Sequence, residues 1–239
     1  TYDLDLTVNV GAASKLKYSV NPPASVASGA TWASFTVAVS DTYLNPRGSG
    51  TDTIAISEDG VAGSFTGTTS KAAVAGEATF SDISYPVAET INVTAAATGL
   101  TSSSSFSVSI TAGSVSYLKV TGAASITAGA NLELTVTAYD SNNNVATGYS
   151  GAKNLTFSGL NSAPAGNAPT VEGVNFGTAV SVTFTNGASN ANAATLIAYK
   201  AEAVAVNVDV TDGTNNSTGA ATYDLDLTVN VGAASKLKY

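Results

Sequence analysis

The residues best suited to hold a cation are oxygen donors in one short loop. Asp140, Asn142 and Asn144 alternate in the sequence YDSNNN. Ca²⁺ prefers oxygen ligands, but one carboxylate is a poor charge match, and the loop lacks the sixth-position glycine and twelfth-position glutamate of an EF-hand. The alternative is a turn closed by the Asp140 side chain, and Asp41 begins a matching turn earlier in the chain. We therefore expect turns here and no metal site.

A pair of carboxylates is the best candidate for acid–base chemistry. Asp3 and Asp5 alternate along a predicted strand, which places them on one face at a spacing of about 7 Å. Acidic residues usually lie on the solvent-exposed face of a strand, so we favour the interpretation that Asp3 and Asp5 are solvated surface residues. Histidine and cysteine are absent, so the commonest general base and the best nucleophile are missing. We expect no enzyme, and neither catalytic nor cofactor-binding residues.

A lysine–asparagine isopeptide cross-link would be a second way to toughen a fibre. Lys15, Lys17 and Lys119 lie on predicted first strands, and Asn9 lies on a predicted last strand. The reaction also needs a buried acid beside the pair. The alternation places these lysines and Asn9 on the solvent-exposed faces of their strands, which argues against a cross-link.

Two other kinds of residue could mark a carbohydrate. Acceptors of the form Asn-x-Ser/Thr occur at Asn92, Asn154, Asn215 and Asn216, and the last two lie in a turn-like stretch that we expect to be the most accessible. Trp32 is the only tryptophan. It could form a sugar-binding platform with some of the ten tyrosines, but buried edge packing is the favoured role.

The composition excludes some classes of partner. The net charge is −8 with nine basic residues and no basic cluster, so nucleic-acid binding is not expected. No apolar run approaches the roughly 18 residues of a membrane span. Charged residues make up only 11% of the chain and cysteine is absent, a balance that fits an exported protein stabilised without disulfides.

The elements that must position these residues are β-strands. Apolar residues alternate with polar ones in several runs, of which Val204, Val206, Val208 and Val210 are the cleanest. Turn residues separate the runs, for example Asn45 to Gly50 and Asp212–Gly213. The Ala-rich stretch from Asn190 to Ala205 is the one helix candidate, and we interpret it as strand with small inward residues. The sequence around Leu160 to Gly173 adds loops of uncertain form.

Internal repeats divide the chain. Residues 1–18 and 222–239 both read TYDLDLTVNVGAASKLKY, an offset of 221 residues. A weaker echo, GSVSYLKV, begins at Gly113 and matches GAASKLKY at Gly11. The spacing near 100 residues is the size of one immunoglobulin-type sandwich. We therefore expect domains at 14–113 and 114–234, with residues 1–13 the last strand of a preceding repeat and 235–239 the start of the next.

Three segments resemble the immunoglobulin-like tandem repeats of large bacterial surface proteins. Residues 13–45, beginning ASKLKYSVNPPASVASGATW, resemble the opening of such repeats, and residues 75–85 and 91–113 resemble their closing half. Residues 126–159, beginning ITAGANLELTVTAYD, are similar to the same class. The resemblance implies two consecutive antiparallel β-sandwich domains, an all-β fold. It implies no activity, because such repeats serve as spacers in unrelated proteins.

These observations together favour a structural role. We expect a tandem-repeat segment of an extracellular or cell-surface filament, stalk, surface layer or giant adhesin, with neighbouring repeats as its partners in fibrous self-assembly. The alternative is an adhesin module that binds a glycan or a host protein through its loops. An exposed cluster of aromatic side chains on one face would favour the alternative.

Overall fold

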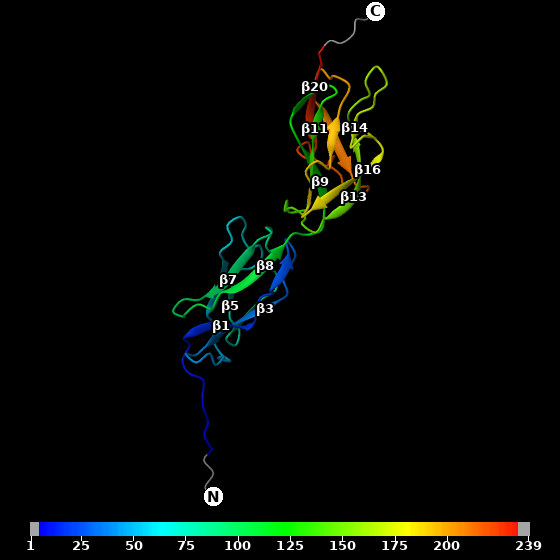
Figure 1. Cartoon of the computed structure of the whole chain (residues 1–239). Helices are drawn as coiled ribbons and strands as arrows, with labels where there is room; N and C mark the ends of the chain where they lie inside the picture. Colours follow the sequence, from blue (N-terminus) through cyan, green and yellow to red (C-terminus); the bar gives the residue numbers. More distant parts are fainter. Residues whose placement is uncertain (1–4, 234–239) are drawn as a thin grey trace, which may run out of the picture. The chain divides into compact units, whose positions relative to one another are not determined.

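The computed structural model describes residues 5–233. All the regular secondary structure in these residues is β-strand. The chain divides into two compact units, residues 1–111 and 112–239 (Figure 1). The predicted all-β fold of largely antiparallel sandwiches is confirmed. Asp3, one of the two paired carboxylates, and the predicted start of a next repeat at 235–239 lie outside the described residues.

The first unit packs a three-stranded sheet against a five-stranded sheet. The strand orders are β1-β3-β6 and β2-β8-β7-β4-β5. The strands are β1 (Lys15–Val20), β2 (Ser25–Ala27), β3 (Phe35–Ser40), β4 (Thr53–Glu58), β5 (Ser70–Ala72), β6 (Glu77–Phe80), β7 (Thr90–Ala96) and β8 (Phe106–Thr111).

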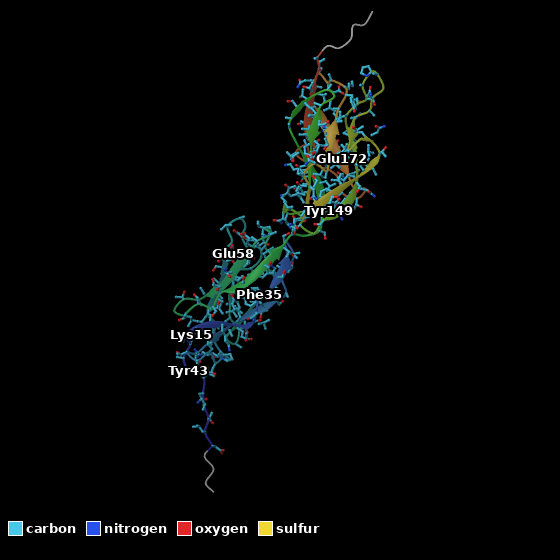
Figure 2. All side chains as sticks on the ribbon, viewed as in Figure 1. Lys15, Phe35, Tyr43, Glu58, Tyr149 and Glu172 are labelled. Atoms are coloured by element: carbon cyan, nitrogen blue, oxygen red, sulfur yellow. The ribbon has the colours of Figure 1, made fainter. Side chains whose placement is uncertain are left out.

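The core of the first unit lies between these sheets because alternate residues of each strand point inward. Along β4 and β7, for example, the apolar residues Ile54, Ile91 and Val93 are buried while the residues between them are exposed. Aromatic rings fill the centre, where Phe35 stacks on Phe80 at 5.3 Å between ring centroids. Figure 2 shows Phe35 within this unit and Tyr43 at its surface.

One short pairing in each unit runs parallel. In the first unit β2 lies parallel to β8, with Val26 opposite Ile110. Pro22 and Pro23 separate β1 from β2, and proline cannot donate to a sheet ladder. The chain therefore leaves the three-stranded sheet there and joins the edge of the other sheet in the reverse sense.

The second unit follows the same plan with more strands. Its sheets have the orders β10-β20-β19-β13-β16-β17-β12-β9 and β11-β18-β14-β15. The strands are β9 (Tyr117–Thr121), β10 (Ser125–Thr127), β11 (Asn131–Glu133), β12 (Thr135–Tyr139), β13 (Gly151–Ser158), β14 (Thr170–Val171), β15 (Val174–Asn175), β16 (Ala179–Thr185), β17 (Ala188–Ser189), β18 (Thr195–Ile197), β19 (Val206–Thr211) and β20 (Leu225–Asn230).

The added sequence around Leu160 to Gly173 contributes one of the extra strands, β14. β14 makes a hairpin with β15, directly after that segment, and the two loop residues, Glu172 and Gly173, have φ of 50° and 76°, as a two-residue hairpin loop requires. The Ala-rich segment 190–205 is a strand only at β18. The prediction of strand is confirmed for β18 and is wrong for the rest of the segment, which is turn and irregular backbone. The predicted inward placement of small side chains is confirmed, since Ala194 and Ala198 are buried in the core.

The duplicated sequence has two different structures. In the second unit it forms β20, paired antiparallel with β19 and parallel with β10. Residues 5–10 carry the same sequence as 226–231, but they form no strand and are exposed. The same residues are therefore a sandwich strand at one place and an uncovered segment at the other.

Candidate functional site

Each unit begins with a short segment that precedes its first strand, residues 5–14 before β1 and residues 112–116 before β9, and we call it the leading segment. Both units hold this segment with the same side-chain arrangement. In the first unit the backbone N–H of Gly11 donates to Asp41 Oδ2 at 3.1 Å. In the second unit the N–H of Gly113 donates to Asp140 Oδ2 at 2.9 Å. We call this arrangement the Asp–Gly clasp, made by Gly11, Asp41 and Asn45 in the first unit and by Gly113, Asp140 and Asn144 in the second.

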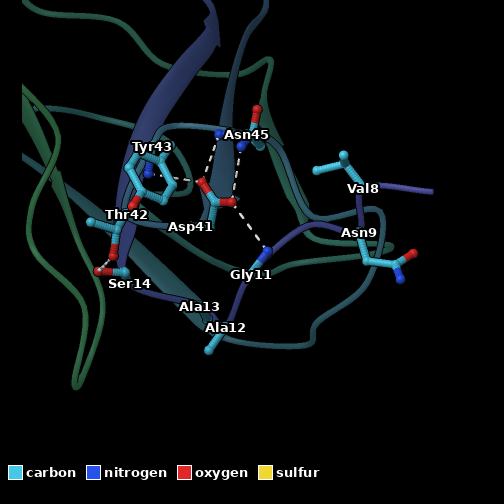
Figure 3. A pocket seen from close by; sticks show the side chains of 10 residues that line it. All are labelled: Val8, Asn9, Gly11, Ala12, Ala13, Ser14, Asp41, Thr42, Tyr43 and Asn45. Carbon is cyan, nitrogen blue, oxygen red and sulfur yellow. Dashed lines mark hydrogen bonds between the residues drawn. The ribbon is translucent and has the colours of Figure 1, made fainter. Parts of the chain in front are cut away.

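The aspartate of each clasp also closes the turn in which it lies. Asp41 Oδ1 accepts the N–H groups of Tyr43 and Asn45, each at 2.9 Å, and Asp41 Oδ2 accepts the Asn45 side-chain amide at 3.0 Å (Figure 3). Each of these bonds has a counterpart in the second unit.

There Asp140 Oδ1 accepts the N–H groups of Asn142 and Asn144 at 2.8 and 2.9 Å, and Asp140 Oδ2 accepts the Asn144 amide at 3.0 Å. The third residue after each aspartate, Leu44 or Asn143, has a φ of 66°. The matching turns predicted from the sequence are thus confirmed.

The bonds of the clasp set the charge of its carboxylate. The Asn45 side-chain amide is the largest influence, and the N–H groups of Asn45, Gly11 and Tyr43 act in the same direction, so the pKa of Asp41 falls from 3.8 to about 2 despite its partial removal from solvent. A carboxylate that accepts several N–H bonds is stabilised in its charged form. Asp41 and Asp140 are both buried, so each clasp is a buried, hydrogen-bonded anchor, and that of Asp41 is held in its charged form.

This geometry does not suit a cation at Asp140. Four N–H donors point at its two oxygen atoms, whereas a metal needs oxygen lone pairs directed toward it. No group of three or more acidic residues in residues 5–233 is arranged to hold a metal ion.

A shallow pocket adjoins the first clasp. It has a volume of about 440 Å³, and the exposed side chain of Tyr43 lies on one side of it, with Val8 and Asn9 of the leading segment on the other (Figure 3). A similar pocket of about 390 Å³ lies beside Gly113 and Tyr149 in the second unit. Both pockets occur where the leading segment joins its sandwich.

The other candidate residues do not come together as sites. Asp5 and Asn9 are exposed on the leading segment. Lys17 donates to the backbone oxygen of Leu44 at 2.7 Å, Lys15 lies on β1, and Lys119 lies on β9 of the other unit. No bond recorded for these lysines in residues 5–233 joins them to an asparagine or to an acid.

The four glycosylation acceptors differ in what their side chains do. The amide nitrogen of Asn92 donates to Asp59 Oδ2 at 3.0 Å, and that of Asn215 donates to Asp212 Oδ2 at 3.1 Å. Asn154 and Asn216 are exposed. Asn216 is exposed, as predicted, although its Oδ1 accepts the N–H and the hydroxyl of Thr218 at 3.1 and 2.7 Å. The side chains of Asn215 and Asn216 thus both take part in local turns.

Trp32 belongs to the core of the first unit. Its side chain is buried, and its ring meets Phe65 edge-on with centroids 5.3 Å apart. The favoured interpretation of Trp32 as a packing residue is confirmed, and a sugar platform built on it is excluded by its burial.

Two features were not found from the sequence. Tyr117 stacks between Tyr139 and Tyr223, with ring centroids 5.2 and 3.9 Å apart, and all three rings are half-buried. The buried serines Ser103 and Ser217 accept in matching places, since Ala95 N–H and Val210 N–H each donate to the serine oxygen at 2.9 Å. The tyrosines lie far apart in the sequence, and Ser103 is one of four consecutive serines, so neither had a sequence signal.

Comparisons with known proteins give a fold-level likeness only. No family model and no curated protein matches the chain. Among solved structures, the surface-layer protein SbsC matches with domains 1–6 (12% identity, TM-score 0.33, 95% of this chain and 29% of that one) and with domains 4–9 (15%, TM-score 0.30, 93% and 32%). A glycosyl hydrolase family 2 member from Bacteroides cellulosilyticus matches at 12% identity and a TM-score of 0.32, over 77% of this chain and 23% of that one.

The chain spans less than a third of the length of each of these proteins. The TM-scores are low, so the description of the fold rests on the strands and cores of this chain. In residues 5–233 there is no helix with the length and apolar character needed to cross a membrane.

Proposed function

We propose that the chain is a non-enzymatic structural segment of a tandem-repeat protein at the cell surface or outside the cell. Its domains are residues 14–113 and 114–234, residues 1–13 carry the sequence of the last strand of a preceding repeat, and 235–239 begin the next. Neighbouring repeats are its partners in a filament, stalk, surface layer or giant adhesin.

The observation that carries this proposal is the recurrence of the Asp–Gly clasp. The glycine of the second clasp, Gly113, follows β8 after only Ala112, and Asp140 holds it. In the duplicated sequence Gly11 stands in the same place after the strand sequence that β20 uses. Under this proposal each sandwich grips the backbone directly after the closing strand of the repeat before it, which leaves very little free chain to stretch.

A short, held connection is what a spacer needs, because slack between domains would be drawn out before any sandwich carried load. Each sandwich has its own core, so each can bear load as a unit. The clasp uses only oxygen and nitrogen atoms of the backbone, aspartate and asparagine, and so it needs neither metal nor disulfide.

A concatemer of three 221-residue periods, ending in residues 222–239, tests the proposal by single-molecule force spectroscopy. We expect six separate unfolding events, three releasing about 36 nm and three releasing about 43 nm, because domains of about 100 and about 120 residues extend by roughly 3.6 Å per residue. A variant concatemer without the clasps carries Asp41→Ala and Asp140→Ala in every period, and its force curve should show a longer initial extension before the first unfolding event. Fewer than six events, or an unchanged initial extension in the variant without clasps, would contradict the proposed role.

Electron microscopy of the native material tests the location. Antibody raised against residues 14–221 should label the surface or appendages of the cells that make the protein. Label confined to the cell interior would rule out the extracellular part of the proposal.

The tyrosine stack favours one alternative, an adhesin module that binds a glycan. Tyr117, Tyr139 and Tyr223 form a stack of half-buried rings. Sugars pack on aromatic faces, and the faces left for a sugar are the outer ones of Tyr139 and Tyr223, because neighbouring rings cover both faces of Tyr117. Ring signals of these tyrosines that shift on addition of oligosaccharides, and not in a Tyr117→Ala variant, would support the binding role over a purely structural one.

A further inference from the structure

The segment Asp5–Val10 has the same sequence as Asp226–Val231 but none of its contacts. Leu6 is 77% exposed and Val8 is 85% exposed. Their counterparts Leu227 and Val229 are 0% and 1% exposed. Val10 and its counterpart Val231, at 47% and 83%, are exposed at both places. The largest differences fall on the two side chains that point into the sandwich, Leu227 and Val229, so the uncovered segment lacks the binding slot that β20 has.

The second unit shows what that slot is. β20 lies between β19 and β10, and both neighbours pair with it. Leu227 is opposite Val206 on β19, and Val229 is opposite Ile126 on β10. The N–H of Thr228 donates to the Ala124 oxygen, and the N–H of Ala128 donates to the Asn230 oxygen, each at 2.9 Å. Every one of these contacts depends on residues that the segment at 5–10 also has.

We propose that residues 5–9 bind as the closing strand between β19 and β10 of a second copy of this chain whenever that copy's β20 is displaced. Leu6 then lies opposite Val206, and Val8 lies opposite Ile126. Val10 stays exposed, as Val231 is. Because the two sequences are identical, the second unit has no means of preferring its own strand except that its own strand is tethered to it.

The tether decides which strand occupies the slot. A strand on the same chain acts at an effective concentration of the order of millimolar, well above the concentration of free chain in solution. The intact chain therefore stays monomeric at micromolar concentration, and head-to-tail linkage appears when β20 is disabled. An exposed, unpaired strand that can add to a sheet edge is a known route to such linkage.

This inference concerns pairing between copies and stands apart from the cellular role proposed above, so the two can fail separately. The test uses the whole 239-residue chain with Leu227→Asp and Val229→Asp, which disable β20 and leave residues 1–18 intact. We expect linear oligomers whose mean mass, measured by light scattering after size exclusion, rises with protein concentration. The matched control adds Leu6→Asp and Val8→Asp, and it should remain monomeric at every concentration.

A peptide of residues 1–10 covers the case in which the first variant does not fold alone. Refolded with an excess of this peptide, the variant should recover the thermal transition of the second unit and hydrogen-exchange protection at Val206–Val208. The same peptide with Leu6→Asp and Val8→Asp should do neither. The inference is overturned if both whole-chain variants oligomerise equally, or if the first is monomeric and millimolar peptide restores no transition.

Discussion

At the scale of single residues, Asp41 and Asp140 each use one carboxylate for two purposes. One oxygen closes a local turn, and the other reaches back about 30 residues to a glycine N–H. The glycine suits this place because a Cβ atom on Gly11 would lie 3.2 Å from Asp41 Cβ, a tight contact. Turn and leading segment are therefore ordered together by one ionised side chain.

Replacing Gly11 by proline removes the N–H of the clasp and should raise the pKa of Asp41. In the native chain that pKa is about 2, below the ordinary 3.8. The clasp therefore adds stability above about pH 4, and this stability is lost as pH falls through about 2. We expect Gly11→Pro to raise the pKa in an NMR titration of the Asp41 carboxyl carbon and to shrink the loss of stability between pH 4 and pH 2.

Gly232→Pro is the matched control. Gly232 has the same neighbours in sequence as Gly11 but no recorded bond to an aspartate among residues 5–233. It should leave the pKa of Asp41 unchanged. An unchanged pKa in Gly11→Pro would show that the glycine N–H does not stabilise the carboxylate.

The sequence predicted half of each clasp. Asp followed by alternating amides in YDSNNN is a local turn signal, since the bonds span two to four residues. The glycine partner lies 27 or 30 residues away, and no local rule connects the two. The same limit hid the tyrosine stack, which joins residues of β9, β12 and the segment before β20.

At the scale of strands, alternation predicted which residues face inward because one side of each sheet is buried. It could not predict which strands share a sheet. The pattern of Val206, Val208 and Val210 is present in β19, for instance, but its neighbours β13 and β20 come from both directions along the chain. Short strands such as β14 and β17 carry too few residues for a period to show.

The pairing of β13 with β19 depends on a glycine. Gly159 follows β13 with a φ of 108°, and an added Cβ would overlap the backbone oxygen of Asn207. Gly159→Ala must push the two strands apart, so we expect it to lower the free energy of unfolding of the second unit by about 3 kcal/mol or more. Urea unfolding measured by circular dichroism gives this value.

Gly166→Ala is the matched control, because Gly166 has a φ of 90° and nothing within 4 Å of an added Cβ. At that position alanine loses only the free energy of adopting a left-handed backbone conformation, about 1–2 kcal/mol. Equal effects of the two substitutions would mean that the close approach of β13 and β19 is unimportant for stability.

At the scale of the whole molecule, the two units have separate cores. The buried residues of the first unit form one cluster and those of the second form another. The same sandwich plan, the same clasp and the same buried serine recur in both, although few residues are identical. The two similar phrases GAASKLKY and GSVSYLKV predicted this duplication, because each stands at the start of one unit.

Separate cores predict separate unfolding, and the single tryptophan allows one unit to be followed alone. Trp32 is buried in the first unit, so its fluorescence reports only that unit. Val182→Asp places a charge in the core of the second unit, where the side chain is fully buried, and should unfold it at a cost of about 4 kcal/mol or more. The Trp32 transition should keep its midpoint within about 3 °C, a small shift for a domain of this size.

Val93→Asp is the converse variant, since Val93 is fully buried in the first unit. Trp32 should then emit as a solvent-exposed indole at all temperatures, while circular dichroism still records one cooperative transition from the second unit. A Trp32 midpoint that falls with Val182→Asp, or the loss of every transition in Val93→Asp, would mean that the two sandwiches fold as one. Independent folding would mean that each sandwich of a repeat array yields to load by itself, which spreads the extension of a spacer over many small steps.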